Sequence, residues 1–475
     1  MKHALPLTRR DMLRHSAGLL GSLALAAEAS AQTANDYKAL VCIFMFGAND
    51  HYNMVLPYDA DSHAAYYAIR KGPIALGTNY DGIALARTHL AATALSKALP
   101  DGRQMALNPE MTALKGLFDA GRAGLVMNVG PLILPTTLAQ YNAKSVPLPP
   151  KLFSHNDQQA YWQSTFEAEG AATGWGGRAA DLWQSGNAKA ALTCISVNGN
   201  AVFTSGQQAL TYQMSTTGPS TVNAIKANSL FGSATAAAAL KTLMTQSPAG
   251  IFASDYNQIT RSALNTYDAL LAAVGTTASA TMNAWFPTSA TNSLSAQLKM
   301  VARLIEQQAV LGLRRQVFLV GMGGFDLHDN LAVQHPVLLN RLSQASKEFD
   351  DAMQGLGMGQ MVTSFTASDF GRTLSSNGDG SDHGWGSHHV VMGGAVRGGN
   401  FYGKAPQIGL THSEQVGSGR LLPSTSVEQL AAELSRWMGV SASDMATVLP
   451  NGKNFDLYKL GMFTSGPGAL LAPPA

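Results

Sequence analysis

Histidines and aspartates are concentrated in residues 361–403, which read MVTSFTASDFGRTLSSNGDGSDHGWGSHHVVMGGAVRGGNFYG. Asp369 follows the apolar run that opens this span, and a loop rich in glycine and serine comes next. Carboxylates and neutral imidazoles at this density are the ligands that zinc and other divalent cations use in proteins. A solvated loop with incidental histidines is the alternative. The candidate groups of the loop and of the run that follows it are Asp382, His383, His388 and His389.

The same layout, an apolar run followed by an aspartate, occurs three times in the chain. In a parallel α/β sheet ligands bind at the carboxyl ends of the strands, so three such strands would bring their carboxylates together. Clustered carboxyl groups repel one another and need cations. Arg178 and Arg372 could supply some positive charge, whereas the histidines indicate a metal. The three pairs are residues 39–46 with Asp50, residues 316–320 with Asp326 and His328, and residues 361–366 with Asp369.

Ser154 is the candidate nucleophile. It precedes His155, and Asp157 follows three residues later, a spacing that fits the start of a helix. A hydroxyl there lies at the positive end of the helix dipole, and a nearby metal would lower its pKa further. The alternative is that Ser154 is only a helix cap, with His155 and Asn156 as bystanders.

The composition excludes some classes of function. The chain has 475 residues, of which 46% are hydrophobic and 13% charged, and this predicts a packed globular protein. Without the four basic and two acidic residues of 1–31, the chain carries 28 residues of each sign. A neutral protein of this kind gives no reason to expect binding to nucleic acid or to an acidic membrane surface.

Residues 1–31 predict an export signal. Arg9 and Arg10 form a twin-arginine pattern, an apolar segment follows over residues 17–27, and Ala29-Ser30-Ala31 is typical of a cleavage site. The apolar segment is too short for a permanent membrane span. We therefore expect export by the twin-arginine translocase to the bacterial periplasm or medium. An ordinary N-terminal helix with a chance arginine pair is the alternative.

Apolar runs alternate with amphipathic segments along the rest of the chain. This predicts an α/β fold, a doubly wound and mostly parallel sheet sandwiched by helices, over residues 32–475. Residues about 200–290, rich in Ala, Ser, Thr, Asn and Gly, are expected to form a helical insertion. Cys42 and Cys194 could pair in an oxidising compartment, although the apolar surroundings of Cys42 favour a buried thiol. Expected strands are 39–46, 124–129, 191–197, 316–320 and 361–366, and expected helices are 109–120, 294–308, 331–355 and 428–438.

Several motifs carry a resemblance to a known family. They are the twin-arginine start, FGAND with NMVLPY, FSHNDQQAYW, GMGGFDLHDN, SDFGRTLSSNGDGSDHGWGSHHVVMGGAVRGG and PSTSVEQLAAELSRWMGV. Over nearly the whole of residues 32–475 the chain resembles the exported "domain of unknown function 1501" family. That family is grouped with the alkaline phosphatase and sulfatase superfamily, which uses a two-metal site and a Ser, Thr or formylglycine nucleophile.

The resemblance implies roles for individual residues. Phe370 stands where the superfamily has the histidine of an Asp-His-Gly triplet, which removes one expected ligand. Ser154 falls near the place of the nucleophile, without the Cys/Ser-x-Pro-x-Arg signature of sulfatases. The implied metal ligands are Asp50, Asp326, His328, Asp369, His383 and His388, and the candidates for substrate binding are Asn49, His155 and Arg372.

Two functions from different classes follow. The first is metal-dependent hydrolysis of a phosphate or sulfate ester of a small molecule or glycan. Its cofactor would be a divalent ion, zinc or alternatively calcium, magnesium or manganese. The second is a non-catalytic envelope protein that keeps the fold to bind a glycan or a partner. The density of histidine and aspartate favours the first, whereas Phe370 and the open choice between nucleophile and helix cap for Ser154 favour the second.

Overall fold

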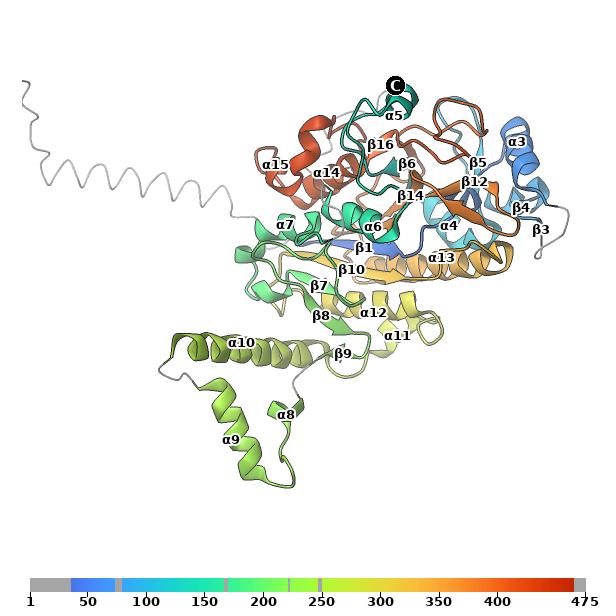
Figure 1. Ribbon diagram of the computed structural model, residues 1–475. Coiled ribbons are helices and arrows are strands. Elements are labelled where there is room, and N and C mark those ends of the chain that lie inside the picture. Colours follow the sequence, from blue (N-terminus) through green and yellow to red (C-terminus); the bar gives the residue numbers. More distant parts are fainter. Residues whose placement is uncertain (1–35, 73–78, 166–169, 221–222, 247–249, 465–475) are drawn as a thin grey trace, which may run out of the picture. The chain divides into compact units, whose positions relative to one another are not determined.

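A computed structural model describes residues 36–72, 79–165, 170–220, 223–246 and 250–464. Contacts divide the chain into residues 1–37 and residues 38–475, and the fold below is that of the second unit (Figure 1). The predicted signal, residues 1–31, lies outside the described residues, and export stays a prediction. In the part of the chain that the structure describes, no helix is long and apolar enough to cross a membrane.

A ten-stranded sheet forms the centre of this unit, in the order β15-β6-β14-β11-β1-β10-β7-β8-β9, with β16 also paired to β6. β1 pairs in parallel with β10 and β11, and parallel pairing continues from β10 through β7 to β8. β14 runs antiparallel to its neighbours β11 and β6, as β9 does to β8. The predicted α/β class with a mostly parallel sheet is confirmed. The strands are β1 (Lys38–Met45), β6 (Ala123–Gly130), β7 (Cys194–Ser196), β8 (Tyr212–Ser215), β9 (Gly218–Pro219), β10 (Arg315–Met322), β11 (Val362–Ser368), β14 (Ser387–Met392), β15 (Phe401–Tyr402) and β16 (Thr425–Ser426).

β1 shows why the central strands are continuous apolar runs. Leu40, Cys42 and Phe44 point to one face, where they share a hydrophobic cluster with residues of α7 (Trp175–Asp181) and α14 (Val427–Met438). Val41 and Ile43 alternate with them and are also fully buried. A strand covered on both faces needs apolar residues at every position. Cys42 and Cys194 are both buried and free, so they form no disulfide.

The long helices begin and end close to the residues that the sequence indicated. α12 (Ser293–Glu306) begins at Asn292, whose side chain accepts hydrogen bonds from two backbone N–H groups of the first turn. α13 (Leu331–Gly355) has the predicted bounds and contacts α12. α14 begins with a capping box between Ser426 and Gln429 and ends at Gly439, which adopts a left-handed conformation.

The stretch predicted as a helical insertion holds more than helices. It contains α8 (Asn223–Lys226), α9 (Ala234–Thr245), α10 (Ile251–Val274) and α11 (Ala280–Trp285), and α9 contacts α10 (Figure 1). It also adds β8 and β9 to the central sheet, which the sequence did not predict because both strands are short and lack an apolar run.

A hairpin of β12 (Arg372–Ser376) and β13 (Ser381–His383) directly follows β11. The remaining elements are α2 (His51–Met54), β2 (Val55–Pro57), α3 (Ala60–Arg70), β3 (Tyr80–Asp81), β4 (Ala84–Leu85), β5 (Met105–Leu107), α4 (Thr112–Asp119), α5 (Leu138–Ala143), α6 (His155–Ser164) and α15 (Met445–Val448), with 3-10 helices at Arg87–Thr93, Pro109–Met111, Gln184–Gly186, Ala190–Leu192 and Pro450–Asn454.

Candidate metal centre

The carboxyl ends of β11, β1 and β10 lie level with one another at one edge of the sheet. Met45, the last residue of β1, is in register with Ser368 of β11 and with Met322 of β10. An aspartate follows each strand within a few residues: Asp369 after β11, Asp50 after β1 and Asp326 after β10. The predicted meeting of three strands at one edge is therefore confirmed, and what each aspartate contacts there is decided by other elements.

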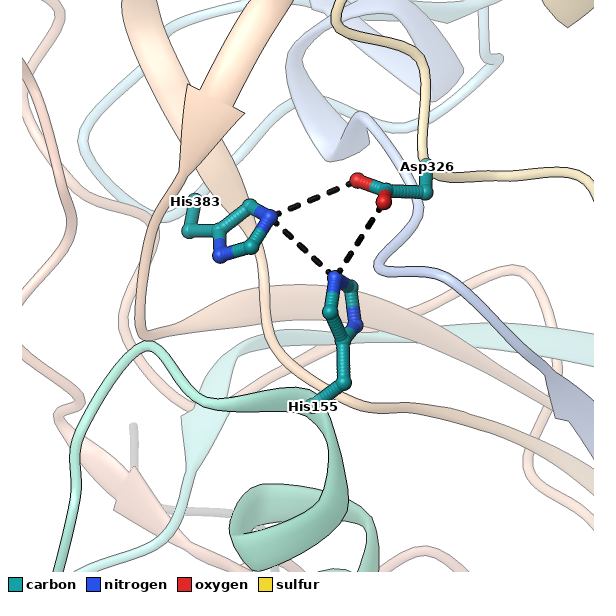
Figure 2. Close-up of side chains that lie close together, drawn as sticks. All are labelled: His155, Asp326 and His383. Atoms are coloured by element: carbon teal, nitrogen blue, oxygen red, sulfur yellow. Dashed lines mark hydrogen bonds and ion pairs between the residues drawn. The ribbon is translucent and has the colours of Figure 1, made fainter.

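Three side chains face one another at this edge: His155, Asp326 and His383, here called the triad (Figure 2). They come from the first residue of α6, the loop after β10 and the last residue of β13. The Nε2 atoms of His155 and His383 are 3.1 Å apart. Each is 3.4 Å from an oxygen of Asp326. All three side chains are partly exposed, so the space between them can be reached from solvent.

The hydrogen bonds of the two imidazoles determine which nitrogen faces the triad as an acceptor. Nδ1 of His155 lies 2.6 Å from a carboxylate oxygen of Asp369, and Nδ1 of His383 lies 2.8 Å from the carbonyl oxygen of Phe153. Both partners only accept, so each Nδ1 carries the proton and each neutral ring presents the lone pair of Nε2. Two lone pairs 3.1 Å apart repel each other unless a proton or a cation lies between them.

The spacing of the triad fits a small divalent cation. Zinc binds imidazole nitrogen and carboxylate oxygen at about 2.0–2.2 Å, which gives a tetrahedral edge of about 3.3–3.6 Å between ligand atoms. In the triad the two Nε2 atoms are 3.1 Å apart, His155 Nε2 is 3.4 Å from Asp326 Oδ2 and His383 Nε2 is 3.4 Å from Asp326 Oδ1, and one ligand atom from each residue lies within 4.8 Å of the other two. Metal-bound histidines also donate their other N–H to a carboxylate or a carbonyl, as both do here. The triad is thus a possible ligand set.

Asp369 lies behind His155, where it positions the ring. Its fully buried carboxylate accepts hydrogen bonds from the backbone N–H of Gly47 at 3.2 and 3.3 Å and from the Gln159 amide at 2.8 Å. His155 and Gln159 are four residues apart on α6 and therefore share a helix face. The hydrogen bond that His155 donates to Asp369 outweighs partial burial and raises the pKa of His155. Asp369, predicted as a direct ligand, contacts the triad through His155.

Arg372 holds the carboxylate of Asp326 in place. Its side chain is fully buried, and one of its terminal nitrogens donates to Asp326 Oδ1 at 2.9 Å. The same nitrogen also donates to the carbonyl of Gly47, and the other two nitrogens donate to the carbonyl of Ser381. Burial raises the pKa of Asp326, but the hydrogen bond and charge of Arg372 more than offset this and the net pKa is lowered. Asp326 is therefore an anion at neutral pH.

His328 lies at the exposed rim of the triad. Its Nε2 is 3.3 Å from Asp326 Oδ1, and its Nδ1 is 3.2 Å from Asp382 Oδ1. The amide of Asn377 also donates to Asp382 at 2.9 Å. Asp326 and His328, which were predicted to act as a pair because they are two residues apart on an extended segment, therefore lie together, with Asp326 in the triad and His328 beside it.

Asp50 has a different set of partners from those predicted. It is fully buried in an ion pair with Arg70, which is also fully buried, and it accepts a hydrogen bond from Ser381 Oγ at 2.8 Å. It also caps α2 through the backbone N–H of Asn53. Burial raises the pKa of Asp50, but Arg70 reverses the effect and the net pKa is lowered. The neighbouring Asn49, predicted to bind substrate, is buried and its Oδ1 contacts Nε2 of His335 at 2.8 Å.

His388 and His389 are parts of the sheet. Both lie on β14 and are buried, and burial lowers the pKa of each to about 3. His388 Nδ1 accepts a hydrogen bond from the backbone N–H of Asn128, and its ring packs edge-on against His51. His389 packs against Trp162. His388, predicted as a ligand, is therefore a neutral histidine in the core, outside the triad.

Ser154 precedes α6, but its hydroxyl does not cap the helix. It accepts no hydrogen bond from the first turn and instead donates to Asp157 Oδ2 at 2.8 Å. The interpretation of Ser154 as a simple cap is wrong in this respect. His155, a bystander in that interpretation, belongs to the triad.

Phe370 backs both imidazoles. It is buried, and its ring centroid lies 4.9 Å from that of His155 and 4.8 Å from that of His383. The sequence did not predict this role or the contact of Gln159 with Asp369. The spacing of His155 and Gln159 on one helix face was a usable signal, whereas nothing local indicated the partner of Asp50, Arg70.

Comparison with solved structures finds loose similarities. The lipoteichoic acid synthase LtaP from Listeria monocytogenes matches with a TM-score of 0.33 and 8% identity, over 88% of this chain and 76% of that chain. Ps i-CgsB in complex with k-i-k-neocarrahexaose matches with a TM-score of 0.32 and 9% identity, over 90% and 78%. Ps i-CgsB alone matches with a TM-score of 0.34 and 9% identity, over 89% and 78%. Superpositions of this quality support no conclusion about activity.

No curated protein matches the chain. The sequence profile of a family does match it, over residues 37–459, which include every residue of the triad and its supporting shell. That family is described as "Protein of unknown function (DUF1501)", and the chain belongs to it.

Proposed function

We propose that this protein is an exported, metal-dependent hydrolase of phosphate or sulfate esters, built on a doubly wound, alkaline phosphatase-like fold. The observation that carries the proposal is the triad, in which two imidazoles whose Nδ1 atoms are held by acceptors turn Nε2 toward each other beside an ionised carboxylate. The physiological substrate would be an ester of a small molecule or a glycan.

In this proposal some residues of the chain orient the metal ligands, and another exchanges a proton with the ester. A divalent cation, zinc before calcium, magnesium or manganese given the two nitrogen donors, would supply positive charge to the ester oxygens and lower the pKa of a water. Asp369 and Arg372 orient the triad. His328, partly exposed and hydrogen-bonded to Asp382, is the histidine at the rim that would exchange a proton with the bound ester.

Two nucleophiles are compatible with this arrangement. If Ser154 attacks the ester, its Oγ would form a bond to phosphorus or sulfur as the bond from that atom to the alcohol oxygen breaks, and its hydroxyl proton would go to Asp157, whose carboxylate already accepts the hydrogen bond. The alcohol would leave with a proton from solvent, and water would then hydrolyse the ester formed on the serine. If a water attacks, Ser154 has no part in the chemistry. Replacing Ser154 with alanine separates the two, because only the first case predicts a loss of turnover by several orders of magnitude.

The contacts favour one cation per chain. A second cation would need further ligand side chains at this edge of the sheet. Asp50 is not free to serve as one, because its charge is already neutralised by Arg70. Phe370 fills the space behind His155 and His383 with an apolar ring, and His388 lies in the core. We therefore expect a mononuclear centre, unlike the two-metal site that the family resemblance implies.

The proposal is tested by metal analysis together with turnover. Wild-type protein loaded with zinc and then dialysed should retain about one zinc per chain and hydrolyse an aryl phosphate or aryl sulfate. His155→Ala, His383→Ala and Asp326→Asn should each lose the metal and the turnover. His412→Ala, which alters a histidine outside the triad, is the matched control and should keep both.

The alternative function, a binding or scaffold protein, has its own support. Phe370 and the engaged hydroxyl of Ser154 both depart from the catalytic arrangement of the superfamily. Retention of one metal without turnover of either ester would favour this alternative. Absence of retained metal from the wild type would reject the metal centre itself.

A further inference from the structure

Helix α10 carries a row of exposed apolar side chains. Phe252, Tyr256, Ile259 and Ala263 follow one another at spacings of four, three and four residues, so they share one face of the helix. Phe252 is 88% exposed, Ile259 69% and Tyr256 55%, and Ala263 is exposed as well. We call these four residues the apolar row. Exposed apolar surface of this kind marks a contact site for a partner.

The neighbours of α10 lie on its other faces. Asn257 and Arg261 donate hydrogen bonds to carbonyls in the last turn of α9, which lies beside α10 (Figure 1). At about 100° per residue around the helix, these two side chains point more than about 120° away from the apolar row. On a third side, Gln258 and Ser262 line a cavity together with residues 188–191. The described residues therefore leave the apolar row uncovered.

The charges near the apolar row favour a protein partner over a membrane. Arg261 is the single basic residue of α10, and it is bound to α9. Asp255 is exposed and lies beside the row. Helices that lie on a membrane surface carry lysine and arginine on their polar face, which anionic lipids attract. The apolar row instead fits an apolar surface of another protein.

The apolar row is complementary to itself. Alternating spacings of four and three residues are those of a coiled-coil seam, in which the side chains of two helices interlock. Two copies can pair antiparallel about a two-fold axis midway between Tyr256 and Ile259. Phe252 then lies opposite Ala263 of the second copy, and Tyr256 lies opposite Ile259. At each end an aromatic ring meets the smallest side chain of the row, so the two faces interdigitate, and the two-fold axis makes each contact twice.

We propose that the apolar row pairs antiparallel with the same row of a second copy of this chain, in a weak and reversible dimer. An aromatic side chain offers about 150–250 Å², so the exposed parts of Phe252, Tyr256 and Ile259 amount to about 400 Å² per copy. A standard interface takes about 800 Å² from each partner, and smaller interfaces are transient. The expected Kd is therefore micromolar. No residue of the triad lies on α10, so the dimer stands whether or not the protein is a hydrolase.

Sedimentation equilibrium of the full chain tests the proposal. Between about 1 and 200 μM the average mass of the wild type should rise from one chain toward two. Ile259→Glu places an unpaired charge in the contact and should weaken association by about tenfold or more. Because Ile259 is largely exposed, this variant should unfold at the same urea concentration as the wild type. Val310→Glu, at an aliphatic residue that is 76% exposed and outside α10, is the matched control and should associate as the wild type does.

A mixture of two variants tests the antiparallel register. Tyr256→Lys alone should stay monomeric, as Ile259→Glu does. Mixed in equal amounts, the two variants should form a dimer, because the introduced lysine faces the introduced glutamate and the other central contact is the wild-type pair. In a parallel pair each introduced charge would face an unchanged residue, and mixing would restore nothing.

Three results would overturn the proposal. They are a wild type that stays monomeric throughout this range, an Ile259→Glu variant that associates as tightly as Val310→Glu, and a mixture that stays monomeric. Cosedimentation with phosphatidylcholine vesicles detects a different occupant. A monomeric wild type that binds these vesicles, with loss of binding in Ile259→Glu, would assign the apolar row to a lipid surface and reject the dimer.

Discussion

Asp369 and Asp50 are both fully buried carboxylates at the same edge of the sheet, yet their partners give them different tasks. Asp369 accepts hydrogen bonds from His155 and Gln159 and so holds the His155 ring in place, whereas Asp50 neutralises a buried guanidinium. Because each carboxylate has one dominant partner, single substitutions should separate metal affinity from stability.

Asp369→Asn should weaken zinc binding with little loss of fold. The amide cannot accept the His155 N–H with the strength of a carboxylate, and loss of such a partner costs about 10–100-fold in metal affinity. A competition titration with a chromogenic zinc chelator measures the change. Gln159→Ala removes one donor to the same carboxylate and should give a smaller change in the same direction. Wild-type affinity in Asp369→Asn would mean that this carboxylate does not position His155.

Asp50→Asn should instead destabilise the fold. It leaves the charge of Arg70 buried and unpaired, and breaking a buried ion pair in this way costs about 3–5 kcal/mol. Urea unfolding of the metal-free protein measures the loss. The folded variant should still bind one zinc per chain, because none of the contacts of the triad includes Asp50. Loss of metal with unchanged stability would show that Asp50 is a ligand, as the family resemblance implies.

At the scale of elements, helices carry several of the decisive side chains into the structure. α6 presents His155 and Gln159 on one face, and α3 ends with Arg70, which reaches Asp50. α14 places a carboxyl group, that of Glu428, in the interior of the protein away from the triad. One oxygen of Glu428 accepts hydrogen bonds from the Tyr161 hydroxyl at 3.2 Å and the Asn451 amide at 2.8 Å. The other oxygen has no partner among the described residues.

Glu428 should make stability fall as pH rises. Burial raises its pKa in the folded protein to about 7, above the value of about 4.3 expected for the unfolded chain. The folded state therefore binds the extra proton between these values. Its contribution to stability is complete below about pH 4, is lost as pH rises through about 7, and changes by at most about 1.4 kcal/mol per pH unit. Urea unfolding of Glu428→Gln between pH 5 and pH 8 should lack this decline. Glu306→Gln, an exposed glutamate, should keep it.

At the scale of the whole molecule, the triad joins segments that are distant in sequence. α6, the loop after β10 and the hairpin after β11 each contribute one side chain. A cation bound by all three would bind only the folded chain, and ligands of this kind stabilise a protein by mass action.

EDTA should therefore lower the melting temperature of the zinc-loaded protein. Free zinc at 100 to 1,000 times its Kd corresponds to about 3–4 kcal/mol of stabilisation, so the shift should be several degrees. Differential scanning calorimetry measures it. A variant with both His155→Ala and His383→Ala should melt at the same temperature with and without EDTA. An equal shift in that variant would place the stabilising metal elsewhere.

Export is the second prediction for the whole chain. Arg9→Lys together with Arg10→Lys should leave unprocessed precursor in the cytoplasm, because the export receptor reads the paired guanidiniums. Immunoblots of cytoplasmic and periplasmic fractions measure this. Normal periplasmic yield of the double variant would reject the twin-arginine assignment.

The sequence by itself determined the strands that lead to the site, the long helices and the sheet edge at which the site lies. β1, β10 and β11 each contain a local apolar run, and α13 has the bounds that the sequence predicted. The rule that parallel strands deliver their carboxyl ends to one edge then placed Asp50, Asp326 and Asp369 there. Only the tertiary structure decided what each residue does. Asp50 meets Arg70 from 20 residues away, and Asp369 meets Gln159 from 210 residues away. His383 and His388 are five residues apart, but one ends a hairpin at the partly exposed site and the other is buried in the sheet. Partner and burial set the charge and role of a side chain, and neither can be read from local sequence.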